Sequence, residues 1–90
     1  MKHTVLVVEQ TEYVRTLLEH ILTLEGYDVT TASGPQEVFS HCTNGNCFDL
    51  FVCDVRLPVM DGHELARWIS SHCPRSRVIH VTGDDRTWRV

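Results

Sequence analysis

The chain has 90 residues, of which 42% are hydrophobic and 22% charged, so we expect one small globular domain rather than a disordered segment. Eight Lys and Arg residues against twelve Asp and Glu residues give a net charge of −4. This balance lacks the basic surface that binds nucleic-acid phosphates, so we expect no nucleic-acid binding by this chain alone. Its apolar runs fall far short of the roughly 18 residues of a membrane span, and the N-terminus does not resemble a signal peptide. We therefore expect a cytoplasmic protein that makes no membrane contact.

The first half of the chain alternates between patterns typical of buried strands and of amphipathic helices. Residues 4–8 are a continuous β-branched and apolar run, as in a parallel strand that is covered on both faces. Residues 11–25 carry one apolar stripe at helical spacing and are followed by a glycine suited to a helix C-terminus. We predict a second strand over 27–31, and a second helix that begins with a cap at Ser33 and ends near residue 42.

The second half of the chain repeats this alternation. After a turn over 43–46, residues 48–53 form a nearly all-apolar third strand that ends at Asp54. We predict a third helix over 63–72 and a fourth strand over 77–81, and we expect the last residues to begin a further helix. This order of strands and helices predicts an α/β fold with a parallel sheet and right-handed crossovers.

Polar residues follow three of the predicted strands. Glu9 and Gln10 follow the first strand, Asp54 follows the third and Thr82 follows the fourth. Ligands of parallel α/β sheets bind beyond the carboxyl ends of the strands, so these side chains are expected to share one cleft. Carboxylate oxygens suit Mg²⁺, and an Asp beside such an ion can act as a nucleophile toward a phosphoryl group. The alternative, that these residues are merely solvated strand ends, is less favoured because all of them converge on the same edge.

At these positions the sequence resembles the response-regulator receiver domain of two-component (phosphorelay) signal transduction. The resemblance is carried by VLVVE at 5–9, by VIHVTG at 78–83, and most specifically by DLFVCDVRLPVMDG at 49–62. It implies a flavodoxin-like parallel sheet of strand order 2-1-3-4-5. It also implies that the chain is a phosphoacceptor and not an enzyme.

The same resemblance assigns roles to individual residues. Asp54 would accept a phosphoryl group from a histidine kinase or a phosphotransfer protein, and Thr82 would be the switch hydroxyl. Mg²⁺ would be bound by Glu9, Gln10, Asp54 and the backbone carbonyl of Arg56.

The sequence departs from the family pattern in two ways. Where the family has an acidic pair, this chain has Glu9 and Gln10, and the loss of one negative charge is expected to weaken Mg²⁺ binding. The chain also stops after the predicted fourth strand, so we expect a C-terminally incomplete receiver domain over 1–90, with order 2-1-3-4 and without the fifth strand and last helix. The open edge of the strand at 77–81 would then permit self-association. These departures support an alternative, a degenerate pseudo-receiver that acts as a phosphorylation-independent protein-interaction module.

The four cysteines form no C-x-x-C pair, and free thiols are the default expectation for a cytosolic chain. Cys53 lies inside an apolar run and is predicted to be a core residue. Cys42, Cys47 and Cys73, with two neighbouring histidines, fall at the end of the sheet opposite Asp54. A zinc site or a disulfide there is a less favoured alternative.

Overall fold

The computed structural model describes residues 2–57, 59–81 and 88–89. Helices and strands alternate along most of the chain, as the sequence predicts. No helix within the described ranges is both long and apolar enough to cross a membrane. The elements are β1 (Thr4–Val8), α1 (Glu12–Leu24), β2 (Asp28–Ala32), α2 (Pro35–His41), the 3₁₀ helix η1 (Thr43–Gly45), β3 (Leu50–Asp54), α3 (Gly62–His72), β4 (Arg77–Val81) and β5 (Trp88–Arg89).

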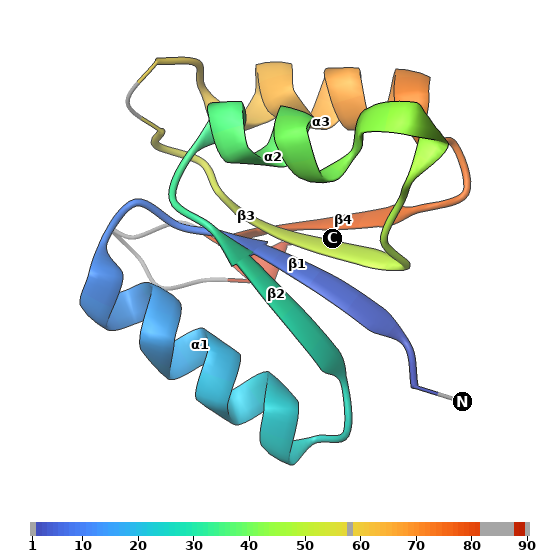
Figure 1. Ribbon diagram of the computed structural model, residues 1–90. Helices are drawn as coiled ribbons and strands as arrows, with labels where there is room; N and C mark the ends of the chain where they lie inside the picture. The colour runs from blue at the N-terminus through green and yellow to red at the C-terminus, as the bar shows by residue number, and fades with distance from the viewer. Residues whose placement is uncertain (1, 58, 82–87, 90) are drawn as a thin grey trace.

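One twisted sheet has the strand order β2-β1-β3-β4-β5, and its first four strands are parallel (Figure 1). The predicted order 2-1-3-4 is therefore confirmed. The expectation of a further helix is wrong for residues 88–89, because they form the short strand β5, antiparallel to β4. This pairing, at His80 and Val81, also corrects the prediction that the whole edge of β4 is open.

Local capping explains where the helices begin and end. The backbone turns at Gly26 with φ of +97°, which closes α1 at the glycine that the sequence predicts. Ser33 does not cap α2 in the predicted way: Gly34 is the N-cap, and the backbone N–H and hydroxyl of Ser33 donate to Glu37. The helix α3 begins with a capping box in which Asp61 accepts from the third helical residue, Glu64, and Glu64 accepts from Asp61.

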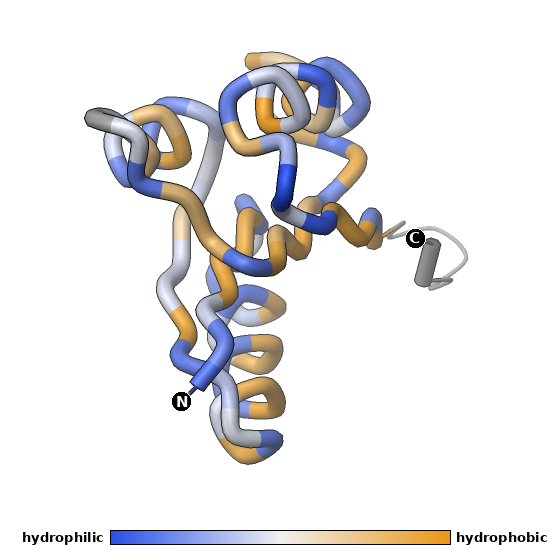
Figure 2. Tube along the Cα trace, turned by 90° about the vertical axis from the view of Figure 1, so that its right-hand side faces the viewer, coloured by the Kyte–Doolittle hydropathy of each residue, from blue (hydrophilic) through white to orange (hydrophobic). Residues whose placement is uncertain are grey.

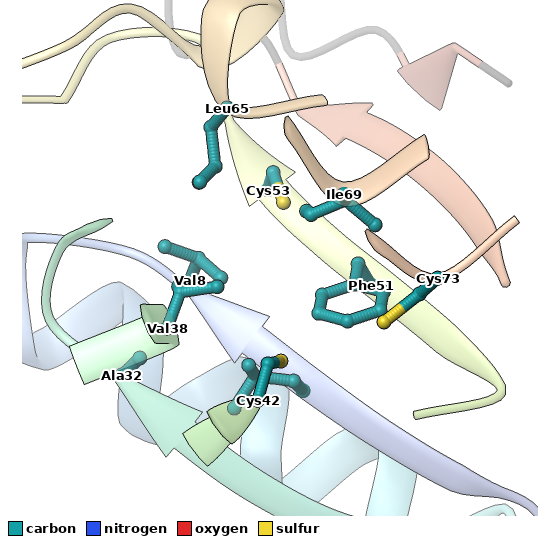
Figure 3. Packing of buried hydrophobic residues seen from close by; sticks show 10 residues of the cluster. Val8, Ala32, Val38, Cys42, Phe51, Cys53, Leu65, Ile69 and Cys73 are labelled. Atoms are coloured by element: carbon teal, nitrogen blue, oxygen red, sulfur yellow. The ribbon is translucent and has the colours of Figure 1, made fainter. Parts of the chain in front are cut away.

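The helices cover the two faces of the sheet unequally. Both α2 and α3 pack on one face, whereas α1 packs on the other (Figure 1). The face under α2 and α3 has the larger buried cluster, part of which is drawn in Figure 3. Its members are Leu6, Val8, Ala32, Val38, Cys42, Phe51, Cys53, Leu65, Ile69 and Cys73.

The face under α1 is less completely buried. Among the described residues, its buried cluster has four members, namely Val5, Val7, Leu18 and Val52. Hydrophobic residues recur along α1 (Figure 2), yet Leu17 and Ile21 remain 45% and 46% exposed and Leu24 is 72% exposed. The apolar stripe of α1 is therefore only partly buried against the sheet.

The cysteines differ from the default expectation. Cys47 and Cys73 form a disulfide with Cα atoms 5.8 Å apart, so the prediction of free thiols is wrong for this pair. The folded chain brings the two residues together because β3 and β4 are neighbours in the sheet. Cys42 and Cys53 are free and buried, which confirms Cys53 as a core residue. Among the described residues, no group of three or more His, Cys, Asp or Glu side chains could hold a metal ion.

Candidate functional site

The carboxyl ends of β1 and β3 lie side by side at one edge of the sheet. Val8 pairs with Cys53, so the next residue of each strand, Glu9 and Asp54, are placed next to each other. Glu9 is only 6% exposed, whereas Asp54 is half-buried. The structure thus brings together two of the acidic residues that the sequence singles out.

The side chain of Glu9 is buried against a second carboxyl group. Its Oε2 accepts a hydrogen bond of 3.0 Å from the backbone N–H of Thr11. Burial raises the pKa of Glu9, and the neighbouring Asp54 carboxyl raises it further, whereas the hydrogen bond from Thr11 opposes that rise. Negative charge is therefore concentrated at this edge, and a cation bound there would relieve the repulsion.

Gln10 is exposed, and the loop that carries it is held by α1. The guanidinium Nη1 of Arg15 donates to the backbone carbonyl oxygens of Glu9 at 2.9 Å and of Gln10 at 3.4 Å. Arg15 therefore braces the turn after β1. Sequence reasoning missed this role, because an arginine six residues after Glu9 gives no local signal that its side chain folds back onto the Glu9 carbonyl.

The loop after β3 fixes the position of Asp54. The backbone N–H of Arg56 donates to Asp54 Oδ1 at 3.0 Å, and the N–H of Gly62 donates to the carbonyl of Val55 at 2.7 Å. A Cβ atom at Gly62 would lie 2.6 Å from the backbone oxygen of Asp54, so only glycine fits without moving this backbone. The capping box at Asp61 anchors the far end of the same loop. Its D-x-x-E spacing was visible in the sequence and is the signal that could have found it.

All of the predicted site roles remain predictions, including those of residues that the structure brings together. Thr82, the expected switch hydroxyl, lies outside the described residues. Arg56 is exposed and its N–H contacts Asp54, but its carbonyl as a metal ligand stays a prediction.

The donor set fits a hard divalent cation better than a soft one. Glu9 and Asp54 supply carboxylate oxygens, and Gln10 follows in the same loop with an amide oxygen. Burial raises the pKa of Glu9 and the neighbouring Asp54 carboxyl raises it further, and a bound cation would offset the part that comes from Asp54. Mg²⁺ is the expected ion, bound more weakly than by an all-carboxylate site.

The family follows from comparison with known proteins. Residues 5–88 match the model of the response regulator receiver domain, which is nearly the whole chain. The chain belongs to this family. The expected resemblance is therefore confirmed, and this receiver domain has the CheY-like, flavodoxin-like architecture.

Similar proteins include regulators and isolated receiver domains. The alkaline phosphatase synthesis transcriptional regulatory protein PhoP of Bacillus subtilis is 34% identical over 85 residues, which are 94% of this chain and 35% of PhoP. The crystal structure of a CheY-like receiver domain protein from Methanospirillum hungatei is 30% identical with a TM-score of 0.85, covering 92% of this chain and 66% of that one. The match to this chain thus spans about a third of the length of PhoP.

Another similar structure contains ligands. TrrA, a response regulator of Thermotoga maritima, is 33% identical with a TM-score of 0.81, covering 91% of this chain and 70% of that one. That TrrA structure is a complex with Mg²⁺ and BeF. TrrA has also been solved in complex with the histidine kinase ThkA.

Proposed function

We propose that this receiver domain accepts a phosphoryl group on Asp54 from a histidine kinase or a phosphotransfer protein, with Mg²⁺ as the cofactor. The observation that carries the proposal is the pairing of Asp54 with the buried Glu9 at the carboxyl edge of the sheet, where Asp54 Oδ1 is held by the Arg56 N–H. The complexes of TrrA with Mg²⁺ and BeF and with a histidine kinase support the same cofactor and partner. We place the protein in the cytoplasm, where such kinases present their phosphohistidine.

In this reaction the chain would be the acceptor of the phosphoryl group and not a catalyst that releases a product. An oxygen of the Asp54 carboxylate attacks the phosphorus of the donor's phosphohistidine, and the bond from phosphorus to nitrogen breaks. The histidine nitrogen keeps the electron pair and takes up a proton, while an acyl phosphate remains on Asp54. Bound Mg²⁺ would offset the charge of the phosphoryl oxygens. Held by Glu9 and Asp54, the ion would also relieve the repulsion between the two carboxylates.

A second function is favoured by one observation. Gln10 replaces an anionic side chain in the loop after β1, and a neutral amide is a weaker Mg²⁺ ligand than a carboxylate. If this loss abolishes phosphorylation, the chain is a pseudo-receiver that binds partner proteins without phosphate.

Phosphorylation by a small donor separates the two functions. We would incubate the chain with acetyl phosphate and Mg²⁺ and measure its intact mass. We expect one phosphoryl group on the wild-type chain and on Asp28→Asn, a control that removes an exposed carboxylate at the start of β2. We expect none on Asp54→Asn.

Each other outcome has a defined meaning. A phosphoryl group that persists on Asp54→Asn would refute Asp54 as the acceptor. A wild-type chain that stays unmodified at saturating Mg²⁺, while folded by circular dichroism, would support the pseudo-receiver instead.

A further inference from the structure

The disulfide lies at the end of the sheet opposite Asp54. Cys47 precedes β3 and Cys73 is the C-cap of α3, and the bond joins them across 26 positions of sequence. This ring of chain contains all of β3 and α3, together with the loop between them. The bond therefore connects the two ends of the segment that carries Asp54.

Hydrogen bonds continue the same connection into the sheet. The hydroxyl of Ser76 donates to the carbonyl of Phe48, and the N–H of Arg77 donates to the carbonyl of Asp49 at 3.0 Å. The parallel pairing of β3 with β4 begins one residue later, at Leu50. The disulfide is thus the outermost of several links that align the starts of β3 and β4.

The two sulfur atoms have different surroundings. Cys47 is an exposed residue. Cys73 is 2% exposed and belongs to the buried cluster beneath α2 and α3. In Figure 3 the Cys73 side chain points toward the ring of Phe51, near Ile69. The exposed residue Cys47 is therefore the one that we expect a dissolved thiol or disulfide to reach, whereas burial of Cys73 shields it.

We propose that Cys47 and Cys73 form a reversible thiol–disulfide redox site that exchanges with small-molecule thiols and disulfides such as glutathione. Cys47 is the residue that reacts with the dissolved molecule, and Cys73 is the resolving residue. The proposal concerns the amino edge of the sheet and does not depend on phosphorylation of Asp54.

The exchange balances with glutathione disulfide as the oxidant. The thiolate of Cys47 attacks one sulfur of glutathione disulfide, which breaks that disulfide and releases one glutathione thiolate. The thiolate of Cys73 then attacks the Cys47 sulfur of the mixed disulfide and releases the second glutathione. Two cysteine thiols are oxidised to one disulfide, one glutathione disulfide is reduced to two glutathione thiols, and the reverse steps reduce the protein.

The other two cysteines are poor competitors for this exchange. Burial raises the pKa of the Cys42 thiol, and burial together with the charge of Asp54 raises that of Cys53 to about 12. Because the thiolate is the reactive form and both residues are buried, we expect both thiols to react slowly with dissolved disulfides at neutral pH. Cys47 is the exposed cysteine of the four and is therefore the favoured point of attack.

Reduction should change the stability of the chain, because it opens a covalent ring. A ring longer than 15 residues stabilises the folded state by about 3 kcal/mol, which is roughly 100-fold in the folding equilibrium constant. We therefore expect the reduced chain to have a folding equilibrium constant about 100-fold lower than the oxidised chain in urea unfolding.

The assignment of roles can be tested with variants. We would incubate reduced wild-type, Cys47→Ser and Cys73→Ala chains with glutathione disulfide, block remaining thiols by alkylation and map them by mass. We expect an internal Cys47–Cys73 disulfide in the wild type, a stable glutathione adduct on Cys47 in Cys73→Ala, and no adduct in Cys47→Ser. Cys42→Ser is the control and should form the internal disulfide like the wild type.

An equilibrium measurement on the wild type completes the test without relying on a variant that might unfold. Across a series of reduced-to-oxidised glutathione ratios, the Cys47–Cys73 bond should open and close reversibly while Cys42 and Cys53 stay reduced. A bond that never forms, one that survives a large excess of reduced glutathione, or an adduct that forms equally well on Cys47→Ser would overturn the proposal.

Discussion

The two edges of the sheet are built in opposite ways. At the amino edge, Cys47 is bonded to Cys73, and Asp49 accepts hydrogen bonds from the N–H and the hydroxyl of Thr4 at 2.8 and 3.3 Å. At the carboxyl edge, Glu9 and Asp54 bring two acidic groups together, one of them buried. The amino edge thus carries a covalent link between the segments that precede β3 and β4, whereas the carboxyl edge carries a buried acidic group that favours a cation. The two edges therefore differ in the kind of chemistry that their side chains can support.

Restoring an anionic ligand at the carboxyl edge should have the largest effect. Gln10→Asp adds a charge-assisted contact to Mg²⁺, and such a contact contributes about 1.5–3 kcal/mol. We therefore expect Mg²⁺ to bind more than tenfold more tightly, measured by titration calorimetry. Thr43→Asp, which adds the same charge at the amino edge, is the control; equal gains in both variants would show that net charge and not the site is responsible.

The glycine beside Asp54 should be the most sensitive backbone position at the carboxyl edge. Gly62→Ala places a Cβ atom 2.6 Å from the Asp54 carbonyl oxygen, and such overpacking costs about 1–3 kcal/mol. We expect lower stability in urea unfolding and slower phosphorylation by acetyl phosphate. In an unstrained helix the same replacement stabilises. A stabilised Gly62→Ala chain would therefore contradict the close packing.

Removing one charge at each edge should have effects of opposite sign. Burial raises the pKa of Glu9, so the folded chain favours the protonated side chain. The stability that this preference contributes is present below pH 4.5, the ordinary pKa, and is lost as the pH rises through the raised pKa. The pKa of Asp49 is lowered by its hydrogen bonds from Thr4, so its contribution is present above 3.8 and is lost as the pH falls.

These signs predict how two amide variants behave without Mg²⁺. At pH 7 we expect Glu9→Gln to be more stable than the wild type, because a neutral amide avoids burying a charge beside Asp54. We expect Asp49→Asn to be less stable. Urea unfolding at pH 7 and pH 4 measures both. A shift of the two variants in the same direction would show that the two edges do not differ as described.

A histidine near the carboxyl edge should have the smallest effect. His80 lies in β4 with its Nδ1 buried and without a hydrogen-bond partner among the described residues, and its ring centre is 4.9 Å from that of His63. Burial lowers the pKa of His80 and the neighbouring His63 lowers it further. The folded chain therefore favours the uncharged ring of His80. The stability that this preference contributes is present above pH 6.5, the ordinary pKa, and is lost as the pH falls toward the lowered pKa.

Replacing this histidine should remove that pH dependence. We expect His80→Val to be more stable by about 0.5 kcal/mol at neutral pH, because valine suits a strand, and by more at pH 5.5. The control is His20→Gln at an exposed position of α1, which should follow the wild type. If the stability of His80→Val and of the wild type changed in parallel between pH 8 and pH 5.5, the lowered pKa of His80 would be contradicted.

Much of the fold was predictable because its signals are local. The apolar run of β1 and the helical stripe of α1 depend only on the spacing of neighbouring residues, and β4 begins and ends where the sequence predicts. The strand order and the placement of Glu9 and Asp54 at one edge then follow from general rules for parallel sheets and from the family resemblance.

Other features were decided by the tertiary structure alone. Cys47 meets Cys73 only because β3 and β4 align side by side, and the short β5 forms only because the edge of β4 offers it a partner. Arg15 reaches the loop after β1 because α1 folds back over its own strand.

The sequence by itself therefore determined the elements from β1 to β4, the family and the acidic residues of the candidate site. The folded chain determined the disulfide, the brace at Arg15 and the close contact between Gly62 and Asp54. The physical reason is the separation in sequence of the residues that interact. Hydrophobic periodicity and capping act between residues a few positions apart, whereas these three contacts join residues from six to 26 positions apart whose distance is set by the packing of the whole sheet.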